Sequence, residues 1–353
     1  MENRIRQALA ARFDAQTAER AKLENLGGHA SLRIYWRITL PSPGPRGEST
    51  LMAMVMPLGD DALKSEEGGS GAVPPELPFI NVQRYLSRLE LPVPQIDHTD
   101  MAIGVLLLED LGQEMFENAY LANPGNAEHL YQQAIDLLIR YQKAVETDTV
   151  HDCIAWDKSF DQPLLRWEMD HYREWGLDAQ HGAEHAAARL PELEAAFDRV
   201  VATLLEAPQT LSLRDYQSRN IMRKNGAWIL IDFQDALRGS CVYDLVALLR
   251  DSYIVLEPPL VQRLVQYYAE QGAQAGLSWC SDASAIHTLF HVQTVQRKLK
   301  DAGRFIFIDR VKGNPSFLPY YEPSIGYVKN ALHHLPQFSD LQSLLVDLEP
   351  AFA

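Results

Sequence analysis

The sequence has few cysteines, no long apolar run and fewer basic than acidic side chains. Three cysteines, Cys153, Cys241 and Cys280, are an odd number without a C-x-x-C spacing, which argues against a disulfide framework and a structural zinc site. No apolar run approaches the roughly 20 residues of a membrane-spanning helix, and the polar N-terminus lacks the apolar stretch of a signal peptide. These absences predict a protein of the reducing cytoplasm with no membrane partner.

The net charge of −15 results from 47 acidic and 32 basic residues. No cluster of lysine and arginine reverses this charge locally, and an acidic surface repels the phosphate backbone of nucleic acids. We therefore expect a small-molecule ligand and no nucleic-acid partner. At 353 residues, of which 46% are hydrophobic, the chain exceeds the usual size of one core, so two lobes are expected. The sequence is compatible with a monomer.

The first part of the chain has the alternation that is typical of β-strands. In residues 32–40, LRIYWRITL, every second side chain is apolar, which predicts a half-buried strand. A turn-rich segment separates it from LMAMVM (51–56), so the two segments predict a hairpin. Residues 58–76 predict a loop, residues 79–89 have helical spacing, and the apolar run at 102–108 predicts a buried strand.

From about residue 113 the pattern changes to long helical segments, with the clearest apolar stripe between Leu130 and Val145. One interruption, LSLRDYQSRNIMRKNGAWILIDFQ at 211–234, has two short apolar stretches around an Asn-Gly turn. This layout predicts an α+β fold with a small β-rich N-terminal lobe, residues 1–108, and a larger, mainly helical C-terminal lobe, residues 109–353.

Three polar residues in the interruption have the chemistry that phosphoryl transfer needs. Asp215 and Asn220 have D-x-x-x-x-N spacing, and Asp232 follows the apolar strand WILI. A carboxylate must orient the attacking hydroxyl and oxygen ligands must hold Mg²⁺ against the phosphates, because catalysis in this class is positioning plus charge neutralisation. We therefore predict Asp215 as the base and Asn220 and Asp232 as magnesium ligands. Each acid alone could be a turn or cap residue; their joint occurrence favours function.

The segments LRDYQSRNIM and IDFQDALRGSCVYDL together resemble the catalytic and metal-binding motifs of the aminoglycoside phosphotransferase and choline kinase family. The resemblance implies a bilobal protein-kinase-like fold and an ATP-dependent, Mg²⁺-dependent transferase that phosphorylates an alcohol. It also implies that Asp244 is a structural acid at a helix start. For Asp235, a helix cap, a substrate contact and a contact to a second metal all stay open.

The sequence departs from the family pattern in two places. The usual H-G-D is L-R-D here, and the strand LMAMVM has no lysine where such kinases place the one that binds the α- and β-phosphates. Arg33, Arg37 or Lys64 could replace that lysine, although each is by default a solvated surface charge. Glu76 is a candidate for the acid that would pair with the replacement.

These departures, together with GGHASLRIYWRI, LEDLG and QRKLKDAGRF, look like a narrower group, the bacterial anomeric sugar kinases of N-acetylmuramate and N-acetylglucosamine. The likeness covers residues 27 to 305 in patches and implies phosphorylation of the anomeric hydroxyl of an amino sugar in cell-wall recycling. It implies a glycine turn over the phosphates, where backbone N–H groups approach the nucleotide, and a hinge that meets the adenine edge. The predicted nucleotide-contacting residues are Gly27, Gly28, Ser31, Arg33, Leu107 and Glu109.

The predicted substrate contacts follow the base and lie on two helices. Arg297 and Lys300 could bind an anionic group such as the lactyl carboxylate of muramate, although a solvated helical face is the simpler interpretation of QRKLK. Trp175 could cover a sugar face, although core packing is simpler. The predicted set is Glu168, His171, Trp175, Gln217, Arg219, Asp235, Arg297 and Lys300.

Two other functions remain open from the sequence. One is a kinase of another small alcohol, such as an aminoglycoside or choline, which would need an acidic pocket for a cationic substrate. The other is a pseudokinase that binds a nucleotide without transferring phosphate. The missing strand lysine supports the second alternative, and the presence of Asp215, Asn220 and Asp232 opposes it.

Overall fold

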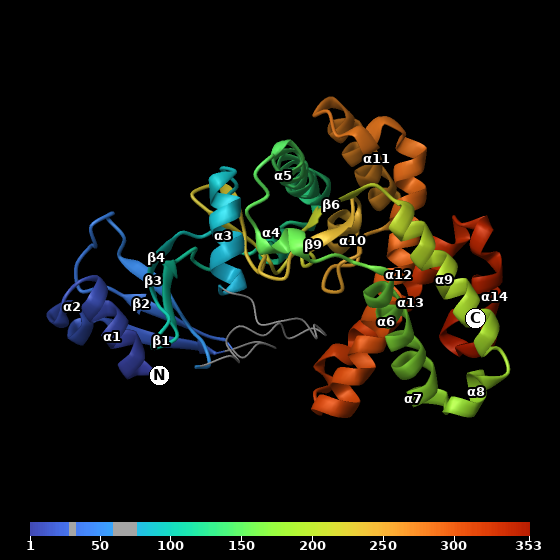
Figure 1. Ribbon diagram of the computed structural model, residues 1–353, viewed down its shortest axis with the longest axis horizontal. Helices are drawn as coiled ribbons and strands as arrows, with labels where there is room; N and C mark the ends of the chain where they lie inside the picture. The colour runs from blue at the N-terminus through green and yellow to red at the C-terminus, as the bar shows by residue number, and fades with distance from the viewer. Residues whose placement is uncertain (28–32, 59–75) are drawn as a thin grey trace. The chain divides into compact units, whose positions relative to one another are not determined.

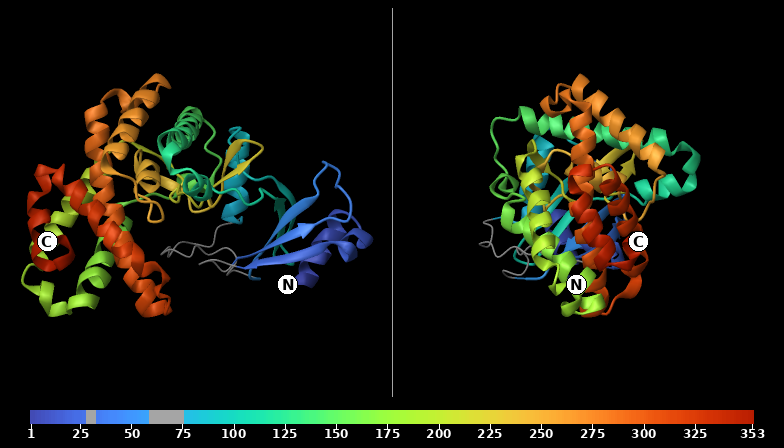
Figure 2. Two further views of the ribbon diagram at one scale, coloured as in Figure 1. Left: turned by 180° about the vertical axis from the view of Figure 1, so that it is seen from behind. Right: turned by 90° about the vertical axis from the view of Figure 1, so that its right-hand side faces the viewer.

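The computed structural model describes residues 1–27, 33–58 and 76–353 (Figures 1 and 2). The chain divides into two compact units. The first unit consists of Met1–Met115, Asp152–Ile154 and Ile221–Asp235. The second unit consists of Phe116–His151, Ala155–Asn220 and Ala236–Ala353. The interruption predicted at 211–234 therefore contributes residues to both units.

An antiparallel sheet with strand order β1-β2-β3-β5-β4 forms the body of the first unit. Its strands are β1 (Lys22–Gly27), β2 (Ile34–Thr39), β3 (Thr50–Val55), β4 (Ile96–Asp100) and β5 (Val105–Glu109). The predicted β2-β3 hairpin and the strand β5 are confirmed. The strands β1 and β4 were not predicted, because both are edge strands whose side chains are mostly exposed or half-buried and so lack apolar alternation.

Two helices, α1 (Glu2–Arg12) and α2 (Ala15–Arg20), pack against one face of this sheet. Trp36 and Ile38 of β2 lie in one apolar cluster with Ile5 and Leu9 of α1, as the alternation in β2 predicts. Arg37 points to the opposite face. The predicted helix at 79–89 is α3 (Pro78–Arg88).

A second hairpin in the first unit joins β7 (Ile221–Lys224) to β8 (Ala227–Leu230). Its two turn residues, Asn225 and Gly226, have φ of 52° and 83°. A two-residue type I′ turn needs positive φ at both positions, which Asn-Gly adopts at low cost. The predicted Asn-Gly turn is therefore confirmed.

The second unit is mainly helical, with one small sheet in which β6 (Gln209–Ser212) pairs antiparallel with β9 (Leu237–Ser240). Its α-helices are α4 (Phe116–Ala122), α5 (Ala127–Thr147), α6 (Gln162–His171), α7 (Ala179–His181), α8 (Ala183–Ala187), α9 (Leu190–Glu206), α10 (Tyr243–Leu249), α11 (Pro258–Gln274), α12 (Ala283–Lys312), α13 (Tyr321–His333) and α14 (Ser339–Leu348). A π-helix, η4 (Tyr172–Asp178), continues α6. The short 3-10 helices are η2 (Pro124–Asn126), η3 (Ile154–Asp157), η5 (Ser278–Ser281), η6 (Pro315–Tyr320), η7 (Pro336–Phe338) and η8 (Pro350–Phe352).

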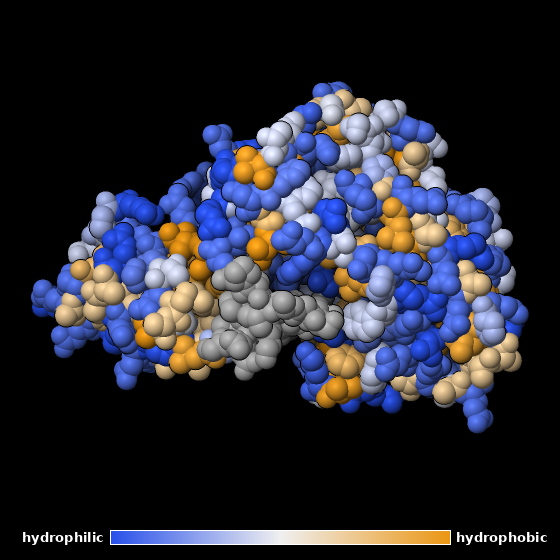
Figure 3. Space-filling view, in the orientation of Figure 1, coloured by the Kyte–Doolittle hydropathy of each residue, from blue (hydrophilic) through white to orange (hydrophobic). Residues whose placement is uncertain are grey.

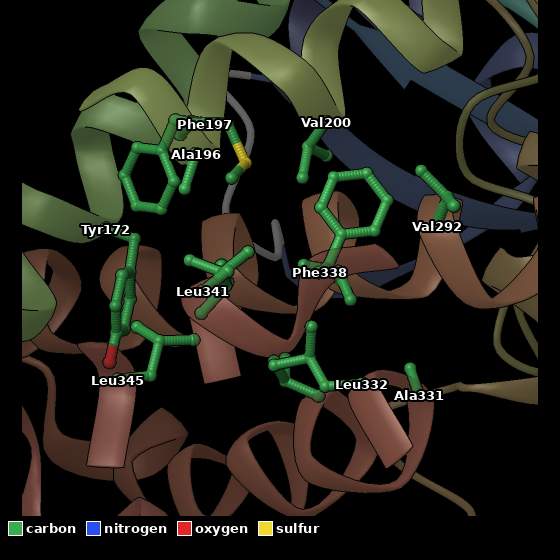
Figure 4. Packing of buried hydrophobic residues seen from close by; sticks show 14 of the residues in the cluster. Tyr172, Ala196, Phe197, Val200, Val292, Ala331, Leu332, Phe338, Leu341 and Leu345 are labelled. Atoms are coloured by element: carbon green, nitrogen blue, oxygen red, sulfur yellow. The ribbon is translucent and has the colours of Figure 1, made fainter. Parts of the chain in front are cut away.

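The core of the second unit joins α9 and α12 to the C-terminal helices α13 and α14. Figure 4 shows Phe197 of α9 near Leu341 of α14, with Leu332 of α13 in the same cluster. The residues after 305, for which the sequence offered no resemblance, therefore complete this core. Burial of such side chains is the main term that stabilises the unit.

The helix α12 packs closely against η4 at Gly303. A Cβ atom at Gly303 would lie 2.7 Å from the carbonyl oxygen of His171 and 2.9 Å from the Cα of Tyr172. Both distances are shorter than van der Waals contact, so only glycine permits this approach of two backbones.

Within the described part of the chain, no helix combines the length and apolar character that crossing a bilayer requires. On the face in Figure 3, hydrophobic residues form small groups among hydrophilic ones. The three cysteines are free and buried.

Candidate active site

The loop after β6, residues 213–220, is held by the carboxylate of Asp244 at the start of α10. This carboxylate accepts hydrogen bonds from Ser212 Oγ and Leu213 N, each at 2.8 Å, and from Arg214 N at 3.0 Å. Burial raises the pKa of Asp244 to about 6, and these three donors oppose the rise. Asp244 is therefore largely ionised at neutral pH and fixes the start of the loop.

Side chains of this loop alternate between the interior and the surface. Tyr216 is buried and donates a hydrogen bond to the carbonyl of Ala134 at 2.7 Å, and Ser218 N donates to Asp251 Oδ2 at 2.9 Å. Asp215 and Gln217 are half-buried, and Arg219 is exposed. The loop thus presents Asp215, Gln217 and Arg219 toward its accessible side, as a catalytic base and substrate contacts would require.

Two neighbours fix the position of Asp215. Asn220 Nδ2 donates a hydrogen bond to the backbone oxygen of Asp215 at 2.9 Å. Arg297 Nη1 donates to the backbone oxygen of Arg214 at 2.9 Å, and its Nη2 lies 3.6 Å from Asp215 Oδ1. The side chain of Arg297 is 2% exposed and that of Asp215 is 34% exposed. A buried cation therefore holds an accessible carboxylate, an arrangement in which the carboxylate can accept a proton from a hydroxyl.

The interpretation of QRKLK as a solvated helical face is wrong. Arg297 faces the loop, and the side chain of Lys300 is only 12% exposed, with Nζ 3.4 Å from Asp301 Oδ1. Lys298 Nζ donates to Asp301 Oδ2 at 2.8 Å and to Ser252 Oγ at 2.9 Å. Burial alone raises the pKa of Asp301, but the charges of Lys298, Lys300 and Arg297 lower it well below its usual value. The segment is an internal charge network.

The direct substrate contact predicted for Arg297 is corrected by the same geometry, because its guanidinium is buried against the loop. The contact predicted for Glu168 is also corrected. Glu168 is 0% exposed, its Oε2 accepts a hydrogen bond from Gln296 Nε2 at 2.5 Å, and its Oε1 lies 3.6 Å from Arg214 Nη2. Both residues are buried in the second unit, where they contact Arg214 of the loop. Arg297 binds its backbone oxygen, and Glu168 pairs with its side chain.

His171 and Trp175 form an aromatic group with Trp167 and Phe307. The ring of His171 lies 5.5 Å from both Trp167 and Phe307, and Trp175 meets Phe307 edge-on at 5.1 Å. His171 is buried, which favours the core-packing alternative for this residue, whereas Trp175 is half-buried. The contact predicted between Trp175 and a sugar stays a prediction.

Arg219 is engaged by α4 and by an aromatic ring. Its Nε and Nη2 donate to the two carboxylate oxygens of Glu117 at 2.8 and 2.9 Å. Its guanidinium carbon lies 3.7 Å from the centre of the Tyr253 ring. These contacts restrict the side chain, which is 44% exposed, to one orientation.

Asp232 and Asp235 belong to the first unit. Asp232 follows β8, is exposed and has φ of 60°, a strained value for a residue other than glycine. Gln234 Nε2 donates to Asp232 Oδ1 at 2.8 Å and to Asp235 Oδ2 at 3.3 Å. Strained residues concentrate at functional turns, so this geometry agrees with a ligand role for Asp232.

Arg33 and Asp232 both act electrostatically on Tyr35 of β2 in the first unit. Burial raises the pKa of Tyr35, the charge of Arg33 and a hydrogen bond with it lower this pKa, and the charge of Asp232 raises it. The Tyr35 hydroxyl donates a hydrogen bond to Met54 Sδ at 3.4 Å. Met54 lies on β3, the strand that lacks the expected lysine.

The other candidates for the missing lysine differ from Arg33. Arg37 donates to both oxygens of Asp110, at 2.9 and 3.2 Å, and to the carbonyl of Gly112 at 2.8 Å, so its donors are used within the unit. Lys64 lies outside the described residues. Glu76, the predicted partner acid, instead forms an ion pair with Arg84 at 2.7 Å.

Of the predicted glycine turn, only Gly27 is described; Gly28 and Ser31 lie outside the described residues. Gly27 has φ of 82°, which glycine adopts without strain, and its N–H donates to Asn25 Oδ1 at 2.8 Å. Gly27 is the last residue of β1 and pairs with Tyr35 of β2, directly after an irregularity in the pairing of the two strands.

The hinge contact predicted for Leu107 is wrong. Leu107 lies opposite Ala53 of β3 on one side and His98 of β4 on the other, so its backbone polar groups face neighbouring strands whichever way they point. At Glu109 the backbone N–H donates to Gln95 O at 2.9 Å. The Glu109 carboxylate accepts from Lys224 Nζ at 2.8 Å, so its side chain holds the β7-β8 hairpin.

The chain belongs to the phosphotransferase enzyme family, whose model matches residues 62–279. The prediction of a phosphotransferase is therefore confirmed. A curated relative from Pseudomonas aeruginosa, an N-acetylmuramate/N-acetylglucosamine kinase, is 30% identical over 271 residues, which are 77% of this chain and 78% of the relative.

Solved structures give the same fold at lower identity. A choline/ethanolamine kinase family protein from Mesorhizobium loti is 14% identical, with a TM-score of 0.57 over 99% of each chain. An ADP-bound aminoglycoside phosphotransferase is 12% identical, with a TM-score of 0.57 over 100% of this chain and 99% of the other. The predicted α+β, protein-kinase-like fold and the resemblance to this family are confirmed.

Proposed function

We propose that the protein is an ATP-dependent kinase that phosphorylates the anomeric hydroxyl of N-acetylmuramate, N-acetylglucosamine or both, in cell-wall recycling. The observation that carries the proposal is the accessible Asp215 carboxylate, held by buried Arg297 and by Asn220. The relative at 30% identity is an N-acetylmuramate/N-acetylglucosamine kinase, which supports the choice of substrate. ADP in a structure of the same fold supports the nucleotide.

In the proposed reaction, Asp215 orients the 1-hydroxyl and accepts its proton while the sugar oxygen attacks the γ-phosphorus. The bond between this phosphorus and the β,γ-bridging oxygen breaks, so the products are the sugar 1-phosphate and ADP. Arg297 holds the Asp215 carboxylate in place. Positioning of this kind supplies a large part of catalysis in phosphoryl transfer.

We assign Asn220 and Asp232 as the magnesium ligands. The contacts of Asn220 and the exposure of Asp232 support these roles separately. Asn220 uses Nδ2 as a donor to Asp215 O, so Oδ1 is the atom that suits a cation, and the exposed Asp232 supplies a carboxylate. Bound Mg²⁺ would neutralise charge that develops on the phosphates. Among the described residues there is no cluster of three or more His, Cys, Asp or Glu side chains, which suits an ion bound largely by phosphate oxygens and water.

The division into a nucleotide-covering lobe, 1–108, and a catalytic and substrate-binding lobe, 109–353, is part of the proposal. In the first lobe, Gly27 would cover the phosphates together with Gly28 and Ser31, and Arg33 would replace the missing lysine. In the second, Gln217 and Arg219 share the accessible side of the loop with Asp215. Asp235, Lys300 and Trp175 remain candidates for the acceptor.

The test is incubation with Mg-ATP and a panel of acceptors: N-acetylmuramate, N-acetylglucosamine, glucosamine, choline and an aminoglycoside. New phosphates are identified by mass spectrometry, and ³¹P NMR locates the phosphate. We expect phosphate on C1 of the two N-acetylated sugars. Transfer to choline or the aminoglycoside alone would support the small-alcohol alternative.

Two controls make this test specific. The methyl glycoside of N-acetylglucosamine has no free 1-hydroxyl and should not react. Asp215→Asn should bind ATP but transfer phosphate far more slowly than the native chain. If the native chain binds ATP and phosphorylates none of the acceptors, the pseudokinase alternative replaces the kinase.

We also propose that the protein works in the cytoplasm, where ATP is available and where its buried free thiols stay reduced. A monomeric state is part of this proposal, and light scattering of the purified chain measures it directly.

A further inference from the structure

A small cavity in the second unit lies outside the loop that carries Asp215. Its free volume is about 10 Å³, which is about one water-sized sphere. Arg250, directly after α10, lines it together with His287 and His291 of α12, Asn330 of α13 and His334. Figure 1 labels the helices concerned.

Arg250 is a buried cation without a matching anion. It is 3% exposed, its Nη2 donates to Asn330 Oδ1 at 2.8 Å, and its Nε has no hydrogen-bond partner. The rings of Phe290 and Tyr327 lie 5.5 and 5.1 Å from its guanidinium carbon. Throughout residues 1–27, 33–58 and 76–353, no carboxylate pairs with it.

The charge of Arg250 persists at neutral pH. Burial lowers the pKa of Arg250 to about 10, so the guanidinium is still protonated at pH 7. A buried charge with neither a counter-charge nor a full set of hydrogen bonds is costly. A water molecule could accept a bond from Nε, but it could not balance the charge.

A second polar atom without a hydrogen-bond partner lines the same cavity. His291 is 9% exposed and its Nδ1 has no hydrogen-bond partner. Its ring is stacked on that of His334 with the centres 4.5 Å apart. Burial, together with the charges of His334, Arg250 and His287, lowers the pKa of His291 to about 3, so the neutral ring has one N–H to donate. His287 Nε2 forms a hydrogen bond with Gln266 Oε1 at 3.2 Å.

We propose that this cavity binds one halide ion, chloride under ordinary conditions, held by Arg250 Nε and the ring N–H of His291. A halide accepts both bonds and neutralises Arg250. A cation is disfavoured by the arginine charge. The site is independent of the proposed kinase activity, because none of its residues belongs to the catalytic loop.

The test begins with protein dialysed into sodium gluconate, whose anion is too large for the cavity. Chloride or bromide is then titrated in at constant ionic strength, and the melting temperature is followed. We expect a saturable rise with either halide. A crystal grown in sodium bromide should show an anomalous peak at Arg250 and His291. A cavity that contains only water in that crystal, or a melting temperature that is equal in gluconate and chloride, would overturn the proposal.

Three variants separate a bound ion from a general salt effect. Asn330→Asp places a carboxylate beside Arg250, so this variant should be stabilised in gluconate and should lose its response to chloride. His291→Phe keeps an aromatic ring but removes a donor, and should weaken halide binding roughly tenfold, the scale of one lost charge-assisted hydrogen bond. Arg263→Ala removes an exposed arginine of α11 and should respond to chloride like the native protein. Equal responses in all three variants would contradict the site.

Discussion

Asp215 and Asp232 are carboxylates of different units with different neighbours, and their substitution should have different kinetic effects. Asp215→Asn should lower kcat by about 10²–10⁴-fold with little change in nucleotide affinity, because a base acts in the transition state. Asp232→Asn should instead raise the Mg²⁺ concentration needed for half-maximal rate, because it removes a ligand charge. Steady-state kinetics over a Mg²⁺ titration distinguishes the two. An unchanged Mg²⁺ dependence in Asp232→Asn would remove that residue from the metal site.

Arg297 is a positioning residue, since it holds Asp215 and the carbonyl of Arg214. Arg297→Met should lower kcat about 100-fold, the scale of a small misplacement of a catalytic group. Arg297→Lys keeps the charge but loses the planar fork, so it should recover only part of the rate. A loss of stability alone would lower the active fraction without changing the pH profile of kcat, so both the profile and the urea midpoint should be measured. Full activity in the folded Met variant would contradict this role.

Among the helices, the close packing of α12 and η4 explains why residue 303 is a glycine. Gly303→Ala should lower the free energy of unfolding by about 1–3 kcal/mol or more, because the added methyl group overlaps backbone atoms of His171 and Tyr172. Gly326→Ala in α13 is the matched control, since a Cβ there meets no atom within 4 Å. It should stabilise the helix by about 0.5–1 kcal/mol. Urea denaturation of both variants checks the pair, and equal effects would mean that contact distance does not decide the outcome.

The charge network of α12 makes the free energy of unfolding depend on pH in the acidic range. The folded pKa of Asp301 lies below the unfolded value of 3.8, so its contribution is complete above about pH 4 and is lost as the pH falls further. Asp301→Asn should lower the free energy of unfolding by about 3 kcal/mol at pH 7, because it leaves buried Lys298 without its acid. The difference between native protein and variant should shrink between pH 4 and pH 2. Urea midpoints across this range test the sign, and a difference that grows on acidification would contradict it.

At the scale of the whole molecule, the sequence predicted the helices and strands whose apolar residues recur at a regular spacing. The hairpin β2-β3, the strand β5, the helices α3 and α5 and the Asn-Gly turn all follow from local periodicity. The edge strands β1 and β4 were missed because neither has a buried face along its length. The family was recognised because its polar motif is short and fixed in spacing.

Tertiary contacts account for what the sequence could not predict about the site. Arg297 and Lys300 have the spacing of a solvated face, and only the tertiary packing around α12 buries them. Asp251, which accepts the hydrogen bond from Ser218 N, had no motif that could have identified it. For Leu107, a continuous apolar run does not distinguish the last strand residues from the hinge that follows them.

The C-terminal helices have a practical consequence for anyone who shortens this protein. The family match ends at residue 279. A fragment cut there would lose all of α12, α13 and α14, and would leave Phe197 and Val200 of α9 facing water. We expect such a fragment to be recovered in inclusion bodies, whereas the full chain stays in the cleared lysate.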